Sequence, residues 1–323
     1  MGISIIARVT IGAAFAASAL YCSAQDYPSR SIRMLIPFTP GGGADISGRL
    51  IGRALTERWG VQFVYDNRPG ASTMIATEIT AKATPNGYTL LMSTGTHTIN
   101  PSIFIKRPFD EISDFTPIVL VSMSPNLVAV NLNVPIKNIS EFVAYAKSHP
   151  GKVNWGTGGH GTHQHMAFEW FRALAGIELT HVPYKGGVPA INDAIGGQLT
   201  MVSVSVPGLA PFVKAGRVRA IAVTSAKRSA LLPDVPTIAE QGYPGFDVSY
   251  WLGLIGPAKM PPSVVNKISQ DTNAALKRPE VREQFLLQGA EPAGGTPQEF
   301  MALLKREIKE WADVVKKVGI KPQ

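Results

Sequence analysis

"MLIPFTPGGGADISGRL", residues 34–50, is the stretch of sequence that decides the fold. Its apolar first residues predict a strand that ends at Pro37, and the residues from Ala44 onward predict a helix. The glycines at 41–43 have no Cβ, so the main chain can approach a ligand closely there. The first N–H groups of the helix lack partners inside the helix and carry partial positive charge. The stretch therefore predicts an α/β unit whose loop suits a small anion. It lacks the lysine and hydroxyl of a P-loop, so nucleotide phosphate is not expected.

A second glycine loop, "NWGTGGHGTHQHMAFEW" at residues 154–170, allows three interpretations. Gly156 to Gly161 match the G-x-G-x-x-G spacing of a dinucleotide-binding turn, with Glu178 about twenty residues further on as the acid for ribose. The strand before this turn is short and half polar, and a lone fingerprint is weak support. The three histidines of the stretch suggest a metal site instead, and its bare glycines suggest a second anion loop.

The histidines of this loop decide between the last two interpretations. His163 and His165 are two residues apart at the predicted helix start, and 3.6 residues per turn point them about 200° apart. Metal-binding helices place their ligands three or four residues apart. The sequence also has no G-x-S-x-G nucleophile turn. We therefore predict an anion loop with no metal and no catalytic residue. The alternative is a secreted metal-dependent hydrolase that uses His160, His163 and His165.

Short apolar strands alternate with amphipathic helices along the chain. Strands are predicted at residues 32–37, 62–67, 89–93, 117–122, 127–131, 152–155, 179–183, 199–204 and 220–224. Helices are predicted at 45–59 and 73–82, from Asn138, and near Thr162, Val188 and Pro207. The C-terminal part is predicted to be helical, with a helix behind a capping box at Thr296 and Glu299. This alternation predicts mostly parallel sheets with helices on both faces. Strands 127–131 and 248–255 are predicted to cross between two domains, which makes residues near 126–247 an inserted domain.

Residues 1–24 predict a secretory signal peptide. One cation, Arg8, precedes an apolar run at 9–20 that is too short to span a membrane. Cleavage is expected near Ala24. The single cysteine, Cys22, lies in this segment, so the mature chain has no disulfide and no thiol nucleophile. Lipidation of Cys22 is not expected, because the bulky Tyr21 precedes it where such sites require a small residue.

The charge of the chain excludes one class of partner. The formal net charge of +8 is spread along the sequence without a basic run of five residues. No nucleic-acid partner is therefore expected, and the charge favours a mild attraction of anionic solutes. About 300 residues remain after the signal, which is enough for two domains of ordinary size.

Eight segments, in order along the chain, resemble the extracytoplasmic solute receptors of tripartite tricarboxylate transporters, also called Bug receptors. They are "IRMLIPFTPGGGADISGR", "YDNRPGAS", "PNGYTLL", "NPSIF", "GGHGTHQHMAFEWF", "HVPYKGGVPAINDAIGGQ", "AGRVRAIAVTSAKRSALLPDVPTIAEQGYPG" and "GTPQEFMALLKREIKEWADVVKKVGIKP". The resemblance implies the type II periplasmic-binding-protein fold, with two doubly wound α/β lobes joined by two crossing strands. Lobe 1 would comprise residues 25–125 and 248–323, and lobe 2 residues 126–247. It also implies a monomeric periplasmic receptor without a cofactor. Such a receptor passes a small organic acid to a two-component membrane permease.

In this family the two glycine loops hold the ligand between the lobes, partly through bound water. The resemblance therefore implies ligand contacts at Phe38, Thr39, Gly41, Gly42, Gly43, Ala44, Asp45, Thr157, Gly159, His160, Gly161, Thr162 and His163. Further contacts are expected at Thr94, Thr96, His97, Tyr184, Lys185 and Ser205. Asp45 is expected to cap N–H groups or to hold a water, because it would repel the carboxylate of a ligand.

One position departs from the pattern of the family. Where the family has Phe-Asp after the "GGQ" segment, this chain has Ser203 and Val204. If that acid recognises an amino or hydroxyl group, an amino-acid ligand is not expected here. A di- or tricarboxylate or an aromatic carboxylate fits better, and His160 and His163 are predicted to hydrogen-bond a second carboxylate.

Overall fold

The computed structural model describes residues 27–322, so the predicted signal peptide and Cys22 lie outside the described residues. The first elements are β1 (Ile32–Ile36), α2 (Gly43–Trp59), β2 (Phe63–Asn67), α3 (Met74–Ala81), β3 (Thr89–Thr94), α4 (Thr96–Ile103), β4 (Phe115–Val130), α5 (Ile139–Ser148) and β5 (Asn154–Thr157). The remaining elements are α6 (His163–Ala175), β6 (Thr180–Pro183), α7 (Gly187–Ile195), β7 (Met201–Ser205), α8 (Val206–Lys214), β8 (Arg219–Val223), β9 (Ser249–Pro257), α9 (Pro262–Lys277), α10 (Pro279–Leu287), β10 (Glu291–Pro292) and α11 (Pro297–Val318). None of these helices has the length and apolar character needed to span a membrane.

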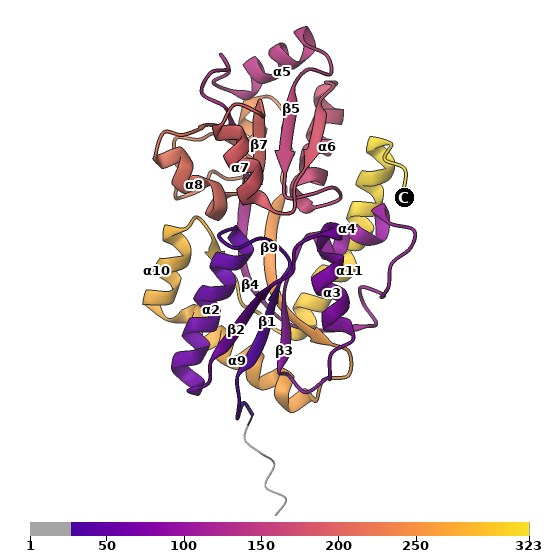
Figure 1. Cartoon of the computed structure of the whole chain (residues 1–323), viewed down its shortest axis with the longest axis vertical. Helices are drawn as coiled ribbons and strands as arrows, with labels where there is room; N and C mark the ends of the chain where they lie inside the picture. Colours follow the sequence, from indigo (N-terminus) through magenta and orange to yellow (C-terminus); the bar gives the residue numbers. More distant parts are fainter. Residues whose placement is uncertain (1–26, 323) are drawn as a thin grey trace, which may run out of the picture.

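The strands form one continuous sheet that changes partners in the middle of β4. Residues 115–125 of β4 pair with β9, which pairs with β3, and β1 and β2 follow. Residues 126–130 of β4 pair with β7, and residues 127–130 pair with β8 on the other side. Strand β7 leads to β5 and β6. We call these two regions half-sheet 1 and half-sheet 2. Figure 1 shows the long strands β4 and β9 in the middle of the molecule, where the two regions meet.

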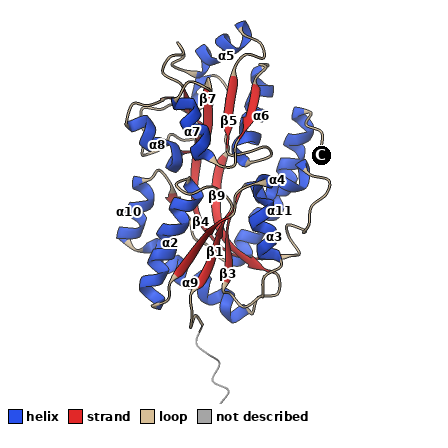
Figure 2. Cartoon of the chain, viewed as in Figure 1, coloured by secondary structure: helices blue, strands red, loops and turns tan. Residues whose placement is uncertain are grey.

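Each half-sheet repeats one arrangement of strands and helices. A central strand, β1 or β5, leads through a glycine loop into a helix, and pairs in parallel with a strand on each side. Helices flank the strands of both half-sheets, as Figure 2 shows. Strands and helices that alternate in this way form doubly wound α/β units, so the predicted fold class is confirmed. The two glycine loops meet at the middle of the molecule.

The apolar core is divided in the same way. Helices α2 and α9 cover half-sheet 1 through buried residues such as Ile51 and Ile268. The core beneath α5 and α6 is built around the fully buried Trp155. Trp311 and Val315 of α11 belong to this second core, so α11 extends from half-sheet 1 to half-sheet 2.

The structure corrects two predictions about elements. The strands predicted at 117–122 and 127–131 are one strand of 16 residues, β4. Pro125 is its last residue paired with β9 and Asn126 its first paired with β7, so the apparent break is the change of partner. Helix α4 was not predicted, because it contains Pro101 and several β-branched residues of low helix propensity. The lobe boundaries near 126 and 248 stay a prediction.

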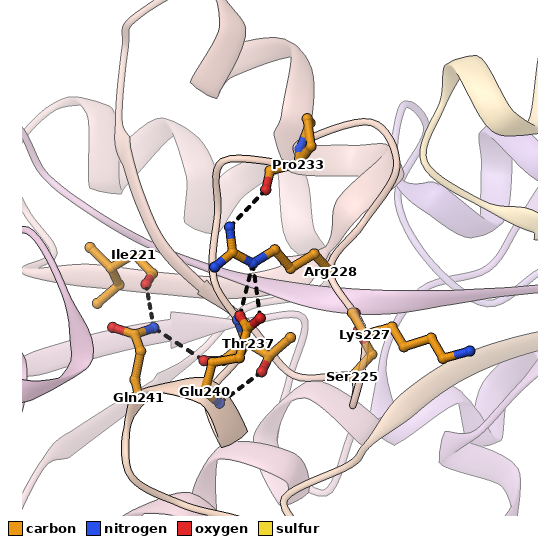
Figure 3. A network of polar contacts seen from close by, with 8 residues as sticks. All are labelled: Ile221, Ser225, Lys227, Arg228, Pro233, Thr237, Glu240 and Gln241. Atoms are coloured by element: carbon orange, nitrogen blue, oxygen red, sulfur yellow. Dashed lines mark hydrogen bonds and ion pairs between the residues drawn. The ribbon is translucent and has the colours of Figure 1, made fainter.

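A long loop after β8 returns the chain to β9 and is held by the polar network of Figure 3. Arg228 Nε donates to both carboxylate oxygens of Glu240 at 2.9 and 3.1 Å, and its Nη1 donates to the Pro233 carbonyl at 3.0 Å. Gln241 Nε2 donates to the carbonyl of Ile221 on β8 at 3.0 Å. The Gln241 bond joins the loop to β8 of half-sheet 2, and the Arg228 bonds hold the loop together.

Candidate functional site

The two glycine loops enclose a small cavity between the half-sheets. An added Cβ on Gly158 of the second loop would lie 3.6 Å from the Phe38 ring of the first. A methyl group on Gly43 would overlap Ser205 Oγ, which directly precedes α8. The cavity measures about 20 Å³, room for about one water molecule. Its walls are formed by Phe38, Gly42, Gly43, Ala44, Gly158, Gln164, Gly187, Val188, Ile191, Val204, Ser205, Gly208 and Tyr250.

Four helices begin at this cavity, because α2, α6, α7 and α8 each place first-turn residues in its wall. In none of the four does the N-cap side chain bond to the first turn. Away from the cavity, α5 and α11 are capped by Asn138 and Thr296, as the sequence predicts, whereas α3, α4, α9 and α10 have no N-cap side-chain bond. Each uncapped helix start carries about half a positive charge on its N–H groups. Among the described residues of the wall there is no lysine or arginine. Main-chain donors therefore provide the positive potential of this cavity.

Asp45 in the first loop is paired within the loop. Its carboxylate accepts the N–H of Gly41 at 3.0 Å and Nδ2 of Asn67 at 3.1 Å. Arg49 Nε donates to it at 3.0 Å. Burial raises the pKa of Asp45, but these hydrogen bonds and the Arg49 charge outweigh burial and lower the pKa below its ordinary value. The expected N–H cap is confirmed, and Arg49 compensates the negative charge beside the cavity.

The second loop takes its shape from glycines and two hydroxyl groups. Thr162 Oγ1 donates to the Gly159 carbonyl at 2.7 Å, and the Gly159 N–H donates to Thr157 Oγ1 at 3.2 Å. Gly159 and Gly161 have φ angles of 142° and 69°, which residues with a Cβ rarely adopt. The threonine hydroxyls thus serve the loop itself.

Three residues predicted as ligand contacts are buried and line neither of the two cavities at the glycine loops. Thr94, Thr96 and His97 are at most 2% exposed and none of them lines the cavity. Thr96 Oγ1 accepts the N–H of His163 at 3.2 Å and so holds the start of α6. His97 Nε2 lies 2.8 Å from the Glu111 carbonyl, and burial lowers the pKa of His97 to about 4. Thr96 and His97 therefore support the local packing, and a ligand contact at these three positions stays a prediction.

His163 also lies away from the cavity. It is 2% exposed, and its Nδ1 lies 3.2 Å from Asn126 Nδ2. Its ring lies edge-on to Tyr250 and Trp311, with 5.5 Å between the ring centroids in both pairs. Burial lowers the pKa of His163 to about 3. The prediction that His163 binds a second carboxylate therefore has no support in the structure. His163 also does not lie together with His160 and His165, as the alternative of a metal-dependent hydrolase would require.

His160 and His165 instead meet a histidine that the sequence analysis missed. Ring nitrogens of His160, His165 and His181 all lie within 4.8 Å of one another. Burial lowers the pKa of each of the three, and for His181 to about 3. His181 belongs to β6, outside the glycine-rich motif, and only the parallel pairing of β5 with β6 brings it close.

A larger and more open cavity of about 580 Å³ adjoins the small one and shares Phe38 and Gly158 with it. Its wall also contains His160, Tyr184 and Lys185, three of the residues predicted to contact the ligand. Tyr184 Oη donates to Asp193 Oδ2 at 2.5 Å. Burial, together with this bond, raises the pKa of Tyr184 to about 12.

Of the other predicted residues, Gly42, Gly43, Ala44 and Ser205 line the small cavity, and Gly159 lines the large one. The Thr39 hydroxyl lies directly against Gly186, so a Cβ added to Gly186 would overlap it. Gly41 is bonded to Asp45, and a Cβ added to Gly161 would meet Ile103 and Phe104.

The sequence analysis missed several residues of the small cavity. Gly187 and Val188 open α7 directly after Gly186, and this third glycine pair before a helix was a usable signal. Gln164 lies on α6, and its buried Oε1 has no partner among the described residues. Tyr250 lies on β9, where no motif marks it.

The two half-sheets share the strand β4, and the N-termini of four helices surround the cavity between them. This arrangement defines a solute-binding receptor of the type II periplasmic-binding-protein class. Comparisons with known proteins agree. The family model of the "Tripartite tricarboxylate transporter family receptor" matches residues 48–320. BugT of Bordetella pertussis is 33% identical over 98% of both chains.

Two solved structures share this fold over almost the whole chain. The R. palustris protein Rpa4515, solved with adipate, has a TM-score of 0.90 and 35% identity, covering 92% of this chain and 100% of the other. MatC from Rhodopseudomonas palustris, solved with bound malate, has a TM-score of 0.85 and 31% identity, covering 90% and 100%. The chain belongs to the tripartite tricarboxylate transporter receptor family. Its members are solute-binding receptors and not enzymes, so the hydrolase alternative is wrong.

Proposed function

We propose that this receptor works in the periplasm, where it binds a small organic acid between two lobes and delivers it to a two-component permease. One carboxylate group of the acid lies at the N-termini of α2, α6, α7 and α8. The observation that carries the proposal is the convergence of these four helix starts, without N-cap side-chain bonds, on one cavity. The signal peptide is removed near Ala24 when the chain is exported, and the receptor acts as a monomer.

Main-chain donors are sufficient for useful affinity. A helix N-terminus contributes about 0.3–1 kcal/mol toward an anion, and up to about 2 kcal/mol when partly buried. Each hydrogen bond to a charged group adds about 1.5–3 kcal/mol. Micromolar affinity requires about 8 kcal/mol, which three or four such bonds together with two helix ends supply without an arginine.

The walls of the two cavities support a particular class of acid. Val204 and Ile191 give the small cavity an apolar side, and no carboxylate competes with the solute there among the described wall residues. The larger cavity continues past Phe38 toward Lys185, whose ammonium group suits a second carboxylate. We therefore favour a dicarboxylate or an aromatic carboxylate, in line with the adipate and malate of the two related structures.

Binding would require the lobes to open and close. A cavity of about 20 Å³ cannot hold a four-carbon acid, so the glycine loops must separate before the solute enters. The proposed lobes are residues 25–125 with 248–323, and residues 126–247. Because α11 contacts both cores, its last turns would adjust during this motion.

A thermal-shift panel of organic acids on the mature chain tests the proposal. A solute that binds only the folded protein raises the melting temperature, by an amount that grows with its concentration. We expect a shift with at least one di- or aromatic carboxylate, undiminished by EDTA and without turnover of the acid. No shift with any carboxylate, or shifts with neutral amides of equal size, would refute it. Deletion of the permease genes should then abolish uptake of the acid that binds.

A further inference from the structure

We propose that His160, His165 and His181 form a binding site for one transition-metal dication such as Zn²⁺, Ni²⁺ or Cu²⁺. Three different elements bring these residues together, namely the second glycine loop, α6 and β6. The site is separate from the small anion cavity. The proposal therefore does not depend on the proposed carboxylate function.

The geometry of the three rings is close to that of a metal site. One ring nitrogen of each residue lies within 4.8 Å of the other two. The ring centroids of His165 and His181 are 4.1 Å apart, and those of His160 and His165 are 4.8 Å apart. Metal–nitrogen bonds of about 2.0–2.1 Å in a tetrahedral site place ligand nitrogens about 3.3 Å from each other. The nitrogens therefore need to approach one another by at most about 1.5 Å. Half-buried His160 can supply this movement, because Gly159 and Gly161 flank it.

The surroundings orient two of the rings. His181 Nε2 lies 2.8 Å from Thr157 Oγ1, and a partner on one ring nitrogen directs the other nitrogen toward a metal. His165 stacks on Trp155 with an interplanar angle of 10°. Glu169 Oε1 lies 3.9 Å from His165 Nε2, while its other oxygen accepts from Arg172. Arg172 compensates the charge of this carboxylate, so the attraction for a metal ion must come from the three ring nitrogens.

Metal binding has one identifiable cost and leaves one position open. The Gly161 N–H donates to His165 Nδ1 at 3.2 Å, and coordination through Nδ1 exchanges this long hydrogen bond for a metal bond. His160 and His181 line the cavity of about 580 Å³, so water or a solute oxygen can reach a fourth coordination position. Three imidazoles select zinc, nickel or copper over magnesium and calcium, which prefer oxygen ligands.

The test is calorimetric titration of the mature chain, produced without a histidine tag and stripped with EDTA, with Ni²⁺ and with Zn²⁺. We expect one ion per chain, with affinity at least tenfold weaker in His160→Ala and in His181→Ala. His149→Ala is the matched control, because that ring stacks on Tyr145 outside the cluster, and its affinity should be unchanged. Thr157→Val keeps all three histidines and removes the hydroxyl beside His181, so a smaller loss is expected.

A spectroscopic measurement covers variants that fold poorly. Co²⁺ in a tetrahedral three-histidine site gives visible absorption, which should vanish in His181→Ala while the far-ultraviolet circular dichroism stays native. Binding that is absent, or equally strong in His160→Ala, His181→Ala and the native chain, would overturn the proposal. Carboxylate binding measured in EDTA reports on the proposed function separately, so the two failures are distinguishable.

Discussion

A methyl group at Gly43 tests whether binding of the solute brings α2 and α8 together. The Cβ of Gly43→Ala would overlap Ser205 Oγ and would lie 3.5 Å from Ser205 Cβ and 3.6 Å from Pro207 Cβ. All three atoms belong to the start of α8, which packs on half-sheet 2, and none belongs to half-sheet 1. The substitution therefore strains the contact between the glycine loops and leaves the packing of α2 on its own sheet intact.

The size of the effect follows from overpacking. Relief of an overlap of this kind costs about 1–3 kcal/mol. Affinity for the solute should therefore fall about 5- to 150-fold, since about 1.4 kcal/mol corresponds to tenfold. The melting temperature without solute should fall much less, because the loops can separate. Calorimetric titration with the acid found in the panel measures the affinity, and a thermal melt measures the stability.

Two further variants test whether the loss of affinity comes from the contact between positions 43 and 205. Ser205→Ala removes the overlapping oxygen. Gly43→Ala should therefore weaken solute binding less in the Ser205→Ala background than in the native chain. Gly196→Ala is the control glycine, because its φ is −73° and its added Cβ meets the nearest atom at 3.4 Å. Native affinity in Gly43→Ala, or no coupling between positions 43 and 205, would refute a closed state in which these loops touch.

Three predictions concern stability. His97 has a folded pKa of about 4 against an ordinary value of 6.5, so the unfolded chain takes up its proton first as the pH falls. The contribution of neutral His97 to the free energy of unfolding is complete above about pH 6.5 and is lost as the pH falls toward 4. Between about pH 7.5 and about pH 5, the free energy of unfolding measured in urea should therefore fall by about 2 kcal/mol less in His97→Gln than in the native chain. Identical pH profiles would contradict this. Thr296→Ala removes the capping box of α11 and should lower the free energy of unfolding by about 1 kcal/mol in the same assay. Thr116→Ala is the comparison, because it removes a hydroxyl hydrogen bond of a strand but no helix cap. Leu304→Ala empties a fully buried site under α11 and should cost about 2–5 kcal/mol, and a loss below about 1 kcal/mol would show that α11 is not packed as described.

Most of the fold could be predicted because its local signals and its tertiary packing agree. The strand, glycine loop and helix of residues 34–50 and the capping box at Thr296 are encoded by neighbouring residues. The crossing strand β4 was split because Pro125 interrupts the apolar run where its partners change. Helix α4 was missed because its packing against α11 outweighs the poor helix propensity of Thr96 to Pro101.

The site could be predicted only in part, for the same reason. The glycines of the two loops were identified because glycine has a local conformational role there. The directions of His97 and His163 were not, since their burial depends on tertiary packing that no short motif encodes. His181 and Tyr250 enter their clusters through strand pairing, which no short motif reveals.

The central claim is that main-chain N–H groups at helix N-termini, between opposed glycine loops, hold the carboxylate of the solute. A crystal structure of the mature receptor with the acid from the thermal-shift panel tests it most directly. We predict carboxylate oxygens within about 2.7–3.2 Å of backbone nitrogens in the first turns of at least two of α2, α6, α7 and α8. An acid held by lysine or arginine side chains outside this cavity, or only through a metal ion at the imidazoles, would contradict the claim.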